Sequence, residues 1–329
     1  MRKNILVLGA GGLIGGHLCK KLMQEGHYVR GVDQTPHRYF GTDFVDSWRM
    51  GDLRDKSFVW TVFDMKFDEV YQLAADMGGA GYIFTGENDA DVMSNSMAIN
   101  LNVLDVAWRT DTPGVFFSSS ACVYPEHAQM STVGLSLVEE SAYPAAPDSE
   151  YGWEKLFAER LYLAYNKNHG MSNSVGRYHN VYGTHCAYAN GKEKAPAAIA
   201  RKVAQASTSV HPSNTIKIWG DGQQTRSFLW VDDAVEATLL LHRHPTFRGP
   251  VNIGSEHMVT IDELVQITMI AADKQLDIAH IPGPTGVAAR TSNNTLVEQE
   301  LGWSPRVPLH VGMSMLYNWV EGEVWADSE

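Results

Sequence analysis

Short apolar segments alternate with helical patterns through roughly the first 180 residues of the chain. Apolar runs of strand length, several of them rich in Val, Ile or Phe, occupy residues 5–8, 28–32, 69–73, 115–118 and 174–178. Between them, apolar residues recur at helical spacing over residues 13–24, 56–64, 91–108 and 150–165. Strands that alternate with helices predict a parallel sheet with helices on both faces. We therefore expect a doubly wound α/β fold.

The pattern becomes less regular after residue 180, where loops rich in Gly, Pro and Asn separate the elements. Helical patterns remain at 194–206, 231–244, 261–272 and 308–320, and one strand pattern at 216–219. We expect residues 1–180 to form the doubly wound domain and residues 181–329 mainly a smaller second lobe. Residues 222–250 are expected to return to the first domain, so the two parts would be interleaved.

The predicted helix over 150–165 is apolar almost all round and includes Trp153, Phe157 and Tyr162. A helix of this kind needs cover on more than one side. The cover can come from the second lobe of the same chain or from a second copy. Because symmetric dimers are the commonest assemblies, we expect a homodimer.

Composition narrows the possible partners. Apolar residues make up 44% of the chain and charged residues only 19%, which is typical of a folded protein with a sizeable core. The net charge of -12 argues against nucleic acid or an anionic membrane as a partner. No apolar stretch reaches the roughly 18 residues that a membrane span needs. The three cysteines, Cys19, Cys122 and Cys186, are too few and too scattered for a disulfide framework, so we expect a cytoplasmic protein.

A glycine-rich turn follows the first predicted strand and opens the first predicted helix. Gly9, Gly12 and Gly15 permit the turn, the approach of a pyrophosphate to backbone N–H groups, and close packing of helix on strand. Asp33 ends the second strand, where a carboxylate would bond the ribose hydroxyls and repel a 2′-phosphate. This context predicts a Rossmann-type site for NAD rather than NADP. Its expected contacts are Gly9, Gly12, Leu13, Ile14, Gly15, Asp33, Asp52 and Leu53, with Tyr151 and Lys155 at the nicotinamide end.

Hydroxyl groups and a Tyr–Lys pair indicate redox chemistry at the carboxyl edge of this sheet. The strand at 115–118 runs into Ser119 and Ser120, and ligands bind beyond the carboxyl ends of parallel strands. Tyr151 and Lys155 are four residues apart, so they share one helical face. An ammonium and a positive nicotinamide would both stabilise the phenolate, which lets tyrosine take a hydroxyl proton near neutral pH. Ser120 could hold the same hydroxyl.

Together these residues resemble the extended short-chain dehydrogenase/reductase family over essentially the whole chain. Within that family, the likeness is to the epimerases that invert C3 and C5 of GDP-mannose. The stretches that carry it are residues 73–79 (LAADMGG), 119–125 (SSACVYP), 151–155 (YGWEK), 177–183 (RYHNVYG), 193–198 (EKAPAA), 219–228 (WGDGQQTRSF) and 280–284 (HIPGP).

The resemblance implies that oxidation at C4 acidifies the protons on C3 and C5 of a hexose, with Cys122 as the base and Lys194 as the acid on the opposite face. Family members that dehydrate sugars carry an Asp–Glu pair where this chain has Ala121 and Cys122. The resemblance also assigns a nucleotide-sugar substrate, GDP-mannose, to contacts with Gly79, Gly81, Asn180, Lys194, Lys202, Gln224 and Arg290.

The residues themselves add one contact and leave two alternatives open. Arg226 is a further candidate for the diphosphate, because a guanidinium binds phosphate oxygens in a bidentate way. His185 and Cys186 alone are too few for a metal site, so we expect none. One alternative is a 4-epimerase acting on another nucleotide sugar, such as a UDP-sugar. The other is a non-catalytic regulator that senses NAD, against which the intact Ser, Tyr and Lys set argues.

Overall fold

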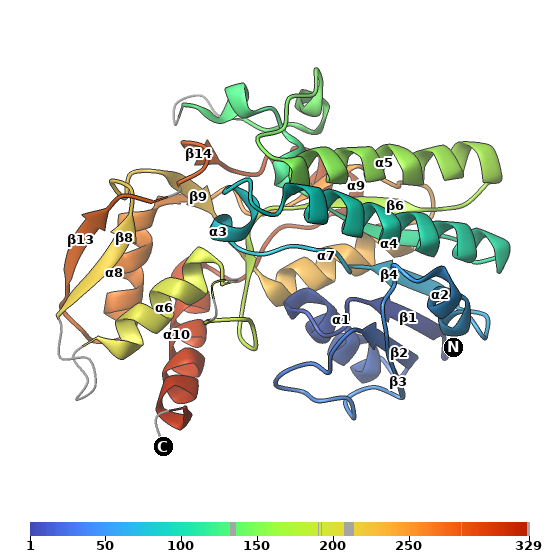
Figure 1. Ribbon diagram of the computed structural model, residues 1–329, viewed down its shortest axis with the longest axis horizontal. Coiled ribbons are helices and arrows are strands. Elements are labelled where there is room, and N and C mark those ends of the chain that lie inside the picture. Colours follow the sequence, from blue (N-terminus) through green and yellow to red (C-terminus); the bar gives the residue numbers. More distant parts are fainter. Residues whose placement is uncertain (132–135, 190, 192, 207–213, 284, 328–329) are drawn as a thin grey trace.

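A computed structural model describes residues 1–131, 136–189, 191, 193–206, 214–283 and 285–327 of the chain. A seven-stranded parallel sheet in the order β11-β6-β5-β4-β1-β2-β3 forms its centre (Figure 1). The expected α/β fold is therefore confirmed. The strands are β1 (Asn4–Leu8), β2 (Tyr28–Asp33), β3 (Ser47–Met50), β4 (Glu69–Gln72), β5 (Val115–Ser120), β6 (Ser174–Tyr178) and β11 (Val251–Ile253).

Alternate residues of the central strands enter two separate cores, one on each face of the sheet. In β1, Leu6 and Leu8 belong to one core, whereas Ile5 and Val7 belong to the other. This alternation follows from the two-residue period of a strand, and both faces are apolar because helices cover both. The first face carries α2 (Lys56–Val62), α4 (Asp89–Arg109) and α5 (Glu150–His169), and the second carries α1 (Leu13–Gln24) and α7 (Val231–Arg243).

The two outer strands of the sheet, β3 and β11, are not among the strands predicted from the sequence. Residues of β3 are half-buried or exposed, since this strand pairs only with β2 at an edge and needs no apolar run. β11 has only three residues, too few for a recognisable period, and pairs with β6. The segment 222–250 contains α7, which packs on the sheet, and β11 follows directly after that segment.

The second lobe is built from small sheets and helices beside the carboxyl edge of the main sheet (Figure 1). Its strands are β8 (Thr215–Trp219) with β13 (Asp277–Ile281), and β9 (Thr225–Ser227) with β12 (Met258–Thr260) and β14 (Ala289–Arg290). The helices of the lobe include α6 (Ala195–Gln205), α8 (Ile261–Ala271) and α10 (Leu309–Ala326), whereas α9 (Thr295–Leu301) packs against β11 and α7 of the sheet domain.

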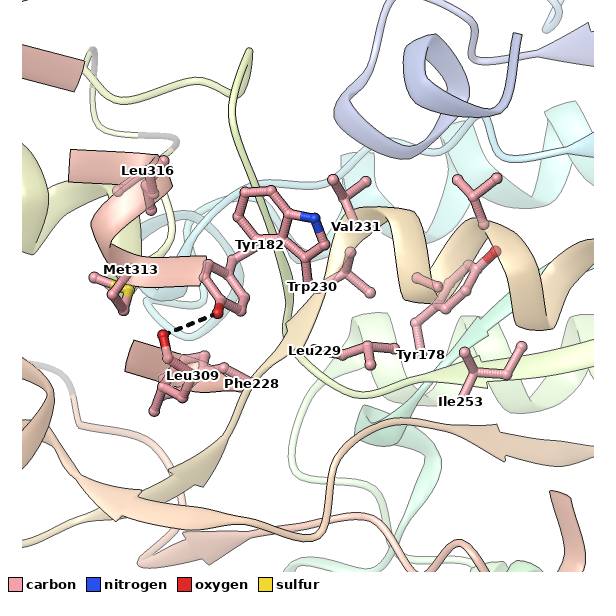
Figure 2. Close-up of a cluster of buried hydrophobic side chains, with 14 of the residues drawn as sticks. Tyr178, Tyr182, Phe228, Leu229, Trp230, Val231, Ile253, Leu309, Met313 and Leu316 are labelled. Atoms are coloured by element: carbon pink, nitrogen blue, oxygen red, sulfur yellow. Dashed lines mark hydrogen bonds between the residues drawn. The ribbon is translucent and has the colours of Figure 1, made fainter. Parts of the chain in front are cut away.

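One apolar cluster fastens the lobe to the sheet domain (Figure 2). The short strands β7 (Val181–Tyr182) and β10 (Leu229–Trp230) run parallel to each other at its centre. The Tyr182 and Trp230 rings pack edge to face at 5.4 Å, and the Tyr182 hydroxyl donates to the carbonyl oxygen of Leu309 in α10 at 3.4 Å. This cluster is continuous with the core under α1 and α7. A shared apolar core therefore holds the lobe in a fixed position relative to the sheet domain.

Candidate active site

The turn between β1 and α1 is too tight for any side chain at Gly15. A Cβ there would lie 2.1 Å from the carbonyl oxygen of Gly9, so only glycine lets the helix approach the strand this closely. The N–H of Gly11 donates to the Asp33 carboxylate at 2.9 Å, which fixes the end of β2 beside the turn. A cavity of about 360 Å³ opens here, and Gly9, Gly12, Asp33 and Leu53 are among its walls. The shape and the donors fit the adenosine and pyrophosphate parts of a dinucleotide.

Asp33 and Asp52 differ in their relation to this cavity. Burial raises the pKa of Asp33, while backbone N–H groups of Gly11, Thr35 and Gln34 act in the opposite direction. Asp52 is not among the lining residues, because its carboxylate pairs with Arg54 at 2.6 Å. Arg54 itself lines the cavity and donates to Asn95 at 2.7 Å. Sequence reasoning missed both Arg54 and Asn95, although Arg54 lies only two residues beyond Asp52.

A larger cavity of about 610 Å³ lies between the carboxyl edge of the sheet and the second lobe. Met77 lines both cavities, so the two meet at this residue. Leu13, Gly15 and Lys155 lie outside the walls of both. The larger cavity brings together twelve of the residues singled out from the sequence, namely Ile14, Gly79, Gly81, Ser120, Cys122, Tyr151, Asn180, Lys194, Lys202, Gln224, Arg226 and Arg290.

Ser120, Cys122 and Tyr151 meet where β5 ends and α5 begins. The chain turns through a short 3-10 helix, Ala121–Val123, and the N–H of Cys122 donates to the Ser120 hydroxyl at 3.2 Å. The Ser120 side chain also favours the phenolate form of Tyr151, so it acts to lower the pKa of that phenol. The first turn of α5 lies directly on this segment, since a Cβ at Gly152 would be 2.2 Å from the Cys122 carbonyl oxygen. The glycine after Tyr151 therefore allows the phenol to reach the end of β5.

Lys155 supports this site from beneath. Its ammonium donates to the Ser118 carbonyl oxygen at 3.0 Å and lies 5.6 Å from the centre of the Tyr151 ring. Burial lowers the pKa of Lys155. Burial also raises the pKa of Tyr151, to which the negative charges of Cys122 and Glu154 add. The lysine alone therefore does not bring the tyrosine pKa down as the sequence suggested, because desolvation of the phenolate outweighs it.

Cys122 and Lys194 line the same cavity but belong to different elements. The thiol sulfur accepts a hydrogen bond from Arg290 Nη1 at 3.1 Å. Lys194 is the N-cap residue of α6, and its side chain makes no capping bond. The residue is exposed and lines the cavity. Desolvation lowers the pKa of its ammonium, and the negative charges of Cys122 and Cys186 act in the opposite direction. A lowered pKa makes an ammonium a better proton donor.

The cavity is strongly cationic although the chain as a whole is acidic. Six basic side chains and one acidic side chain, Glu193, are among its lining residues. Lys202 donates to the Lys217 carbonyl oxygen at 2.7 Å, Gln224 to that of Trp219 at 3.2 Å, and Asn180 to that of Ser227 at 2.9 Å. The basic residues are Lys194, Arg201, Lys202, Lys217, Arg226 and Arg290, of which Arg201 and Lys217 were not predicted from the sequence.

Arg226 differs from the other basic residues because the backbone occupies its guanidinium. Nη1 and Nη2 donate to four carbonyl oxygens, and the shortest of these bonds are 2.7 Å, to Thr225 and Val287. Burial and the charge of Arg290 lower the pKa of Arg226 to about 10. The geometry thus favours Arg226 as an anchor for residues 285–288, which lead into β14, rather than as the diphosphate contact expected from the sequence.

The described residues also bear on metals and membranes. Among them, no group of three or more His, Cys, Asp and Glu side chains is arranged to hold a metal ion. Within the same part of the chain, none of the helices has the length and apolarity that crossing a bilayer requires.

Comparison with known proteins shows which family the chain belongs to. The model of the NAD dependent epimerase/dehydratase family matches residues 5–254, which is most of the chain. The chain belongs to this family. NAD is accordingly its cofactor, as the glycine turn and Asp33 predicted.

The sequence identity of the chain differs between two relatives in the epimerase/dehydratase family. The chain is 41% identical to GDP-mannose 3,5-epimerase of Arabidopsis thaliana over 321 residues, which covers 97% of this chain and 82% of the relative. It is 24% identical to GDP-L-fucose synthase of Escherichia coli, covering 97% of this chain and 96% of that one. The resemblance seen in the sequence motifs therefore extends over nearly the full length.

Solved structures of this family share the fold. UDP-glucose 4-epimerase of Thermotoga maritima, solved with UDP-glucose, aligns with a TM-score of 0.84 at 22% identity, over 98% of this chain and 99% of that one. UDP-glucose 4-epimerase of Thermus thermophilus, solved with NAD, gives a TM-score of 0.82 at 22% identity, over 97% and 99% of the two chains.

Proposed function

We propose that the chain is an isomerase that converts GDP-mannose to GDP-L-galactose, with GDP-L-gulose as the product of a single inversion. The observation that carries the proposal is the placement of Cys122 and Lys194 in one cavity with Ser120 and Tyr151. The 41% identity to GDP-mannose 3,5-epimerase over nearly the whole chain supports the same substrate.

Catalysis begins with the removal of a proton from the C4 hydroxyl of the hexose. Tyr151 accepts this proton while Ser120, which lines the same cavity, holds the hydroxyl oxygen. The glycine turn and Asp33 would hold NAD, which would supply a reversible hydride acceptor for C4. Lys155 fixes the end of β5 through Ser118 and keeps a positive charge below the phenol.

Inversion uses the acidity that the C4 carbonyl gives to its neighbouring carbons. Cys122 removes a proton from C3 or C5 on one face of the ring, and Lys194 delivers a proton to the other face. The thiol has a cationic neighbour in Arg290, and the ammonium has a lowered pKa, so each group is suited to its direction of transfer. Because both side chains reach one cavity from different elements, they can lie on opposite sides of a bound sugar.

The nucleotide end is assigned to the cationic part of the cavity. Lys202 donates one N–H to the Lys217 carbonyl oxygen. Among the described residues, the other two N–H groups of its ammonium can therefore bind phosphate oxygens. Gln224 and Asn180 offer amide groups from the same walls, and Gly79 and Gly81 let the sugar approach the backbone. A diphosphate therefore meets positive charge here despite the net charge of -12.

The proposal is tested by turnover of GDP-mannose in heavy water, with UDP-glucose as the competing substrate. A 3,5-epimerase places solvent deuterium at C3 and C5 of its product. A 4-epimerase changes only C4 and takes up no deuterium at carbon, and a regulator without activity turns over neither sugar. Absence of deuterium at both C3 and C5 contradicts the proposal.

The assembly and location proposed with this function are a homodimer in the cytoplasm. In α5, Trp153 and Phe157 are 41% and 44% exposed, while the charged Glu154 and Glu159 are buried through bonds to Asn100 and Arg177. An outer aromatic face of this kind supports association with a second copy. Three free thiols suit a reducing compartment. We also keep the division into an NAD-binding domain, 1–180 with 222–250, and a substrate-binding lobe within 181–329.

A further inference from the structure

Three protein groups hold the guanidinium of Arg290. Nη1 donates to Cys122 Sγ at 3.1 Å, Nη2 to Asp148 Oδ2 at 2.7 Å and Nε to Gln129 Oε1 at 2.6 Å. The side chains of Arg290 and Asp148 are 7% and 4% exposed, and Gln129 is fully buried. The contacts therefore form in a place where water competes little for the same N–H groups.

Both supports of the guanidinium are themselves fixed to the catalytic segments. Gln129 ends a 3-10 turn, and its amide donates to the carbonyl oxygens of Tyr124 at 3.0 Å and Pro125 at 3.2 Å, just beyond Cys122. Asp148 directly precedes Ser149, which caps α5 through the N–H of Gly152. Arg290 is thus tied both to the turn that carries the thiol and to the start of the helix that carries the phenol.

We propose that Asp148 and Gln129 are positioning residues, which hold the Arg290 guanidinium against the Cys122 sulfur so that the thiol can act as the base. This inference rests on the proposed function, because it concerns the step in which Cys122 takes a proton from carbon. In that step a C–H bond breaks, the proton forms an S–H bond, and the electron pair passes into the enolate of the C4 ketone. Arg290 keeps its charge throughout and favours the thiolate before the transfer.

The charge of Asp148 indicates that this residue helps Cys122 only by orienting the Arg290 guanidinium. A carboxylate close to a thiol disfavours formation of the thiolate, so the negative charge of Asp148 alone would work against the base. An arginine side chain has many rotamers, and contact with the sulfur needs one of them. The Asp148 carboxylate and the Gln129 amide oxygen accept hydrogen bonds from two different nitrogens of the Arg290 guanidinium, and together they select that rotamer. The benefit of orientation then exceeds the cost of the added negative charge.

The test separates proton transfer at carbon from oxidation at C4. Asp148→Asn and Gln129→Leu are mixed with GDP-mannose in heavy water. C4 oxidation is followed by the absorbance of reduced nicotinamide in a single turnover, and exchange by deuterium at C3 and C5. We expect exchange to fall by about tenfold or more in both variants while oxidation changes by less than about threefold. Asp55→Ala is the control: it removes the cap of α2, lines neither cavity, and should lower the Tm without changing the ratio of exchange to oxidation.

A double variant shows whether Asp148 acts through Arg290. In an Arg290→Gln background, Asp148→Asn should lower exchange by no more than about twofold, because the group that it positions is gone. A proportional fall of exchange and oxidation in Asp148→Asn and Gln129→Leu, unchanged exchange, or an additive loss in the double variant overturns the inference. Absence of any exchange in the unmodified enzyme contradicts the proposed function instead.

Discussion

The Lys155 ammonium donates its hydrogen bond to the carbonyl oxygen of Ser118, two residues before the end of the strand that leads to the thiol. The lysine therefore acts on the active site in two ways, by fixing the strand and by placing charge below Tyr151. These two roles can be separated experimentally, because a methionine retains most of the packing but neither the charge nor the bond.

Tyr151→Phe should abolish C4 oxidation, with a loss of about 100-fold or more in the rate of hydride transfer, since the phenol is the group that removes the hydroxyl proton. Lys155→Met should give a smaller loss and move the pH optimum upward, because the phenolate loses its cationic neighbour. The measurement is single-turnover absorbance of reduced nicotinamide against pH. Tryptophan fluorescence quenching by added NAD serves as the control for cofactor binding. A full rate in Tyr151→Phe would exclude the phenol as the base for the C4 hydroxyl.

Cys122→Ala and Lys194→Met should fail at different points after C4 oxidation. Without the thiol, no proton leaves C3 or C5, so recovered sugar should carry no deuterium there. Without the ammonium, the thiol still exchanges the proton on its own face, so deuterium should enter without inversion, while the yield of epimer falls by about 100-fold. Mass spectrometry and proton NMR of recovered sugar distinguish the two results. Full epimerisation by Cys122→Ala would remove the thiol from the mechanism.

Gly15→Ala should damage both the fold and the cofactor site, because the added Cβ would lie 2.1 Å from the Gly9 carbonyl oxygen. We expect a loss of about 2 kcal/mol or more in the free energy of unfolding together with weaker binding of NAD. Gly322→Ala in α10 is the matched control, since nothing lies within 4 Å of its added Cβ. That variant should gain about 0.5–1 kcal/mol from helix propensity. Equal behaviour of the two alanines would contradict the tight turn.

The free energy of unfolding should decrease as the pH drops below about 6.5, because the folded chain holds a histidine in its neutral form. Burial lowers the pKa of His242 from its usual 6.5 to about 4, and its Nδ1 lies 2.9 Å from the Ser174 hydroxyl. Between these two pH values the unfolded chain binds more protons than the folded chain, so acid favours unfolding, and His242 alone should cost about 2 kcal/mol at pH 5. Urea unfolding at pH 7.5 and 5 measures the effect. His242→Gln should reduce the pH dependence, to which the buried His179 also contributes, whereas the exposed His257→Gln should leave it unchanged.

Trp153→Glu combined with Phe157→Glu should yield a monomer in sedimentation velocity, because charge on the outer face of α5 would oppose a second copy. Leu240→Glu is the matched control. That side chain is 40% exposed on α7, which covers the opposite face of the sheet. A dimer that survives the double substitution would mean that association uses another surface.

The sequence predicted those parts of the site whose signals are local. The glycine turn, the Tyr–Lys spacing and the strand that ends in Ser120 each lie within a few residues, so period and spacing expose them. The Cys122–Arg290 contact joins positions 168 residues apart and depends on how β14 pairs with β9, which no local pattern encodes. The same holds for Arg226, whose guanidinium looks free in the sequence but is satisfied by the carbonyl oxygens of a distant loop.

Helix faces show a second limit of the pattern. The apolar appearance of residues 150–165 hid the fact that Glu154 and Glu159 point inward, where Asn100 and Arg177 donate hydrogen bonds to their carboxylates. Periodicity assumes that charge lies outside and apolar groups inside, and this assumption fails next to a catalytic centre.

The pairing of β11 with β6 sets a limit on cutting this protein into parts. A fragment that stops near residue 180 would lack the strand that closes this side of the sheet, and β6 would expose a row of free backbone donors and acceptors beside the buried Val175. Such a fragment should aggregate when produced alone, even though it contains the whole glycine turn. Chimeras that exchange substrate preference between relatives should therefore replace loops around the cleft and leave the continuity of the chain through residue 253 intact.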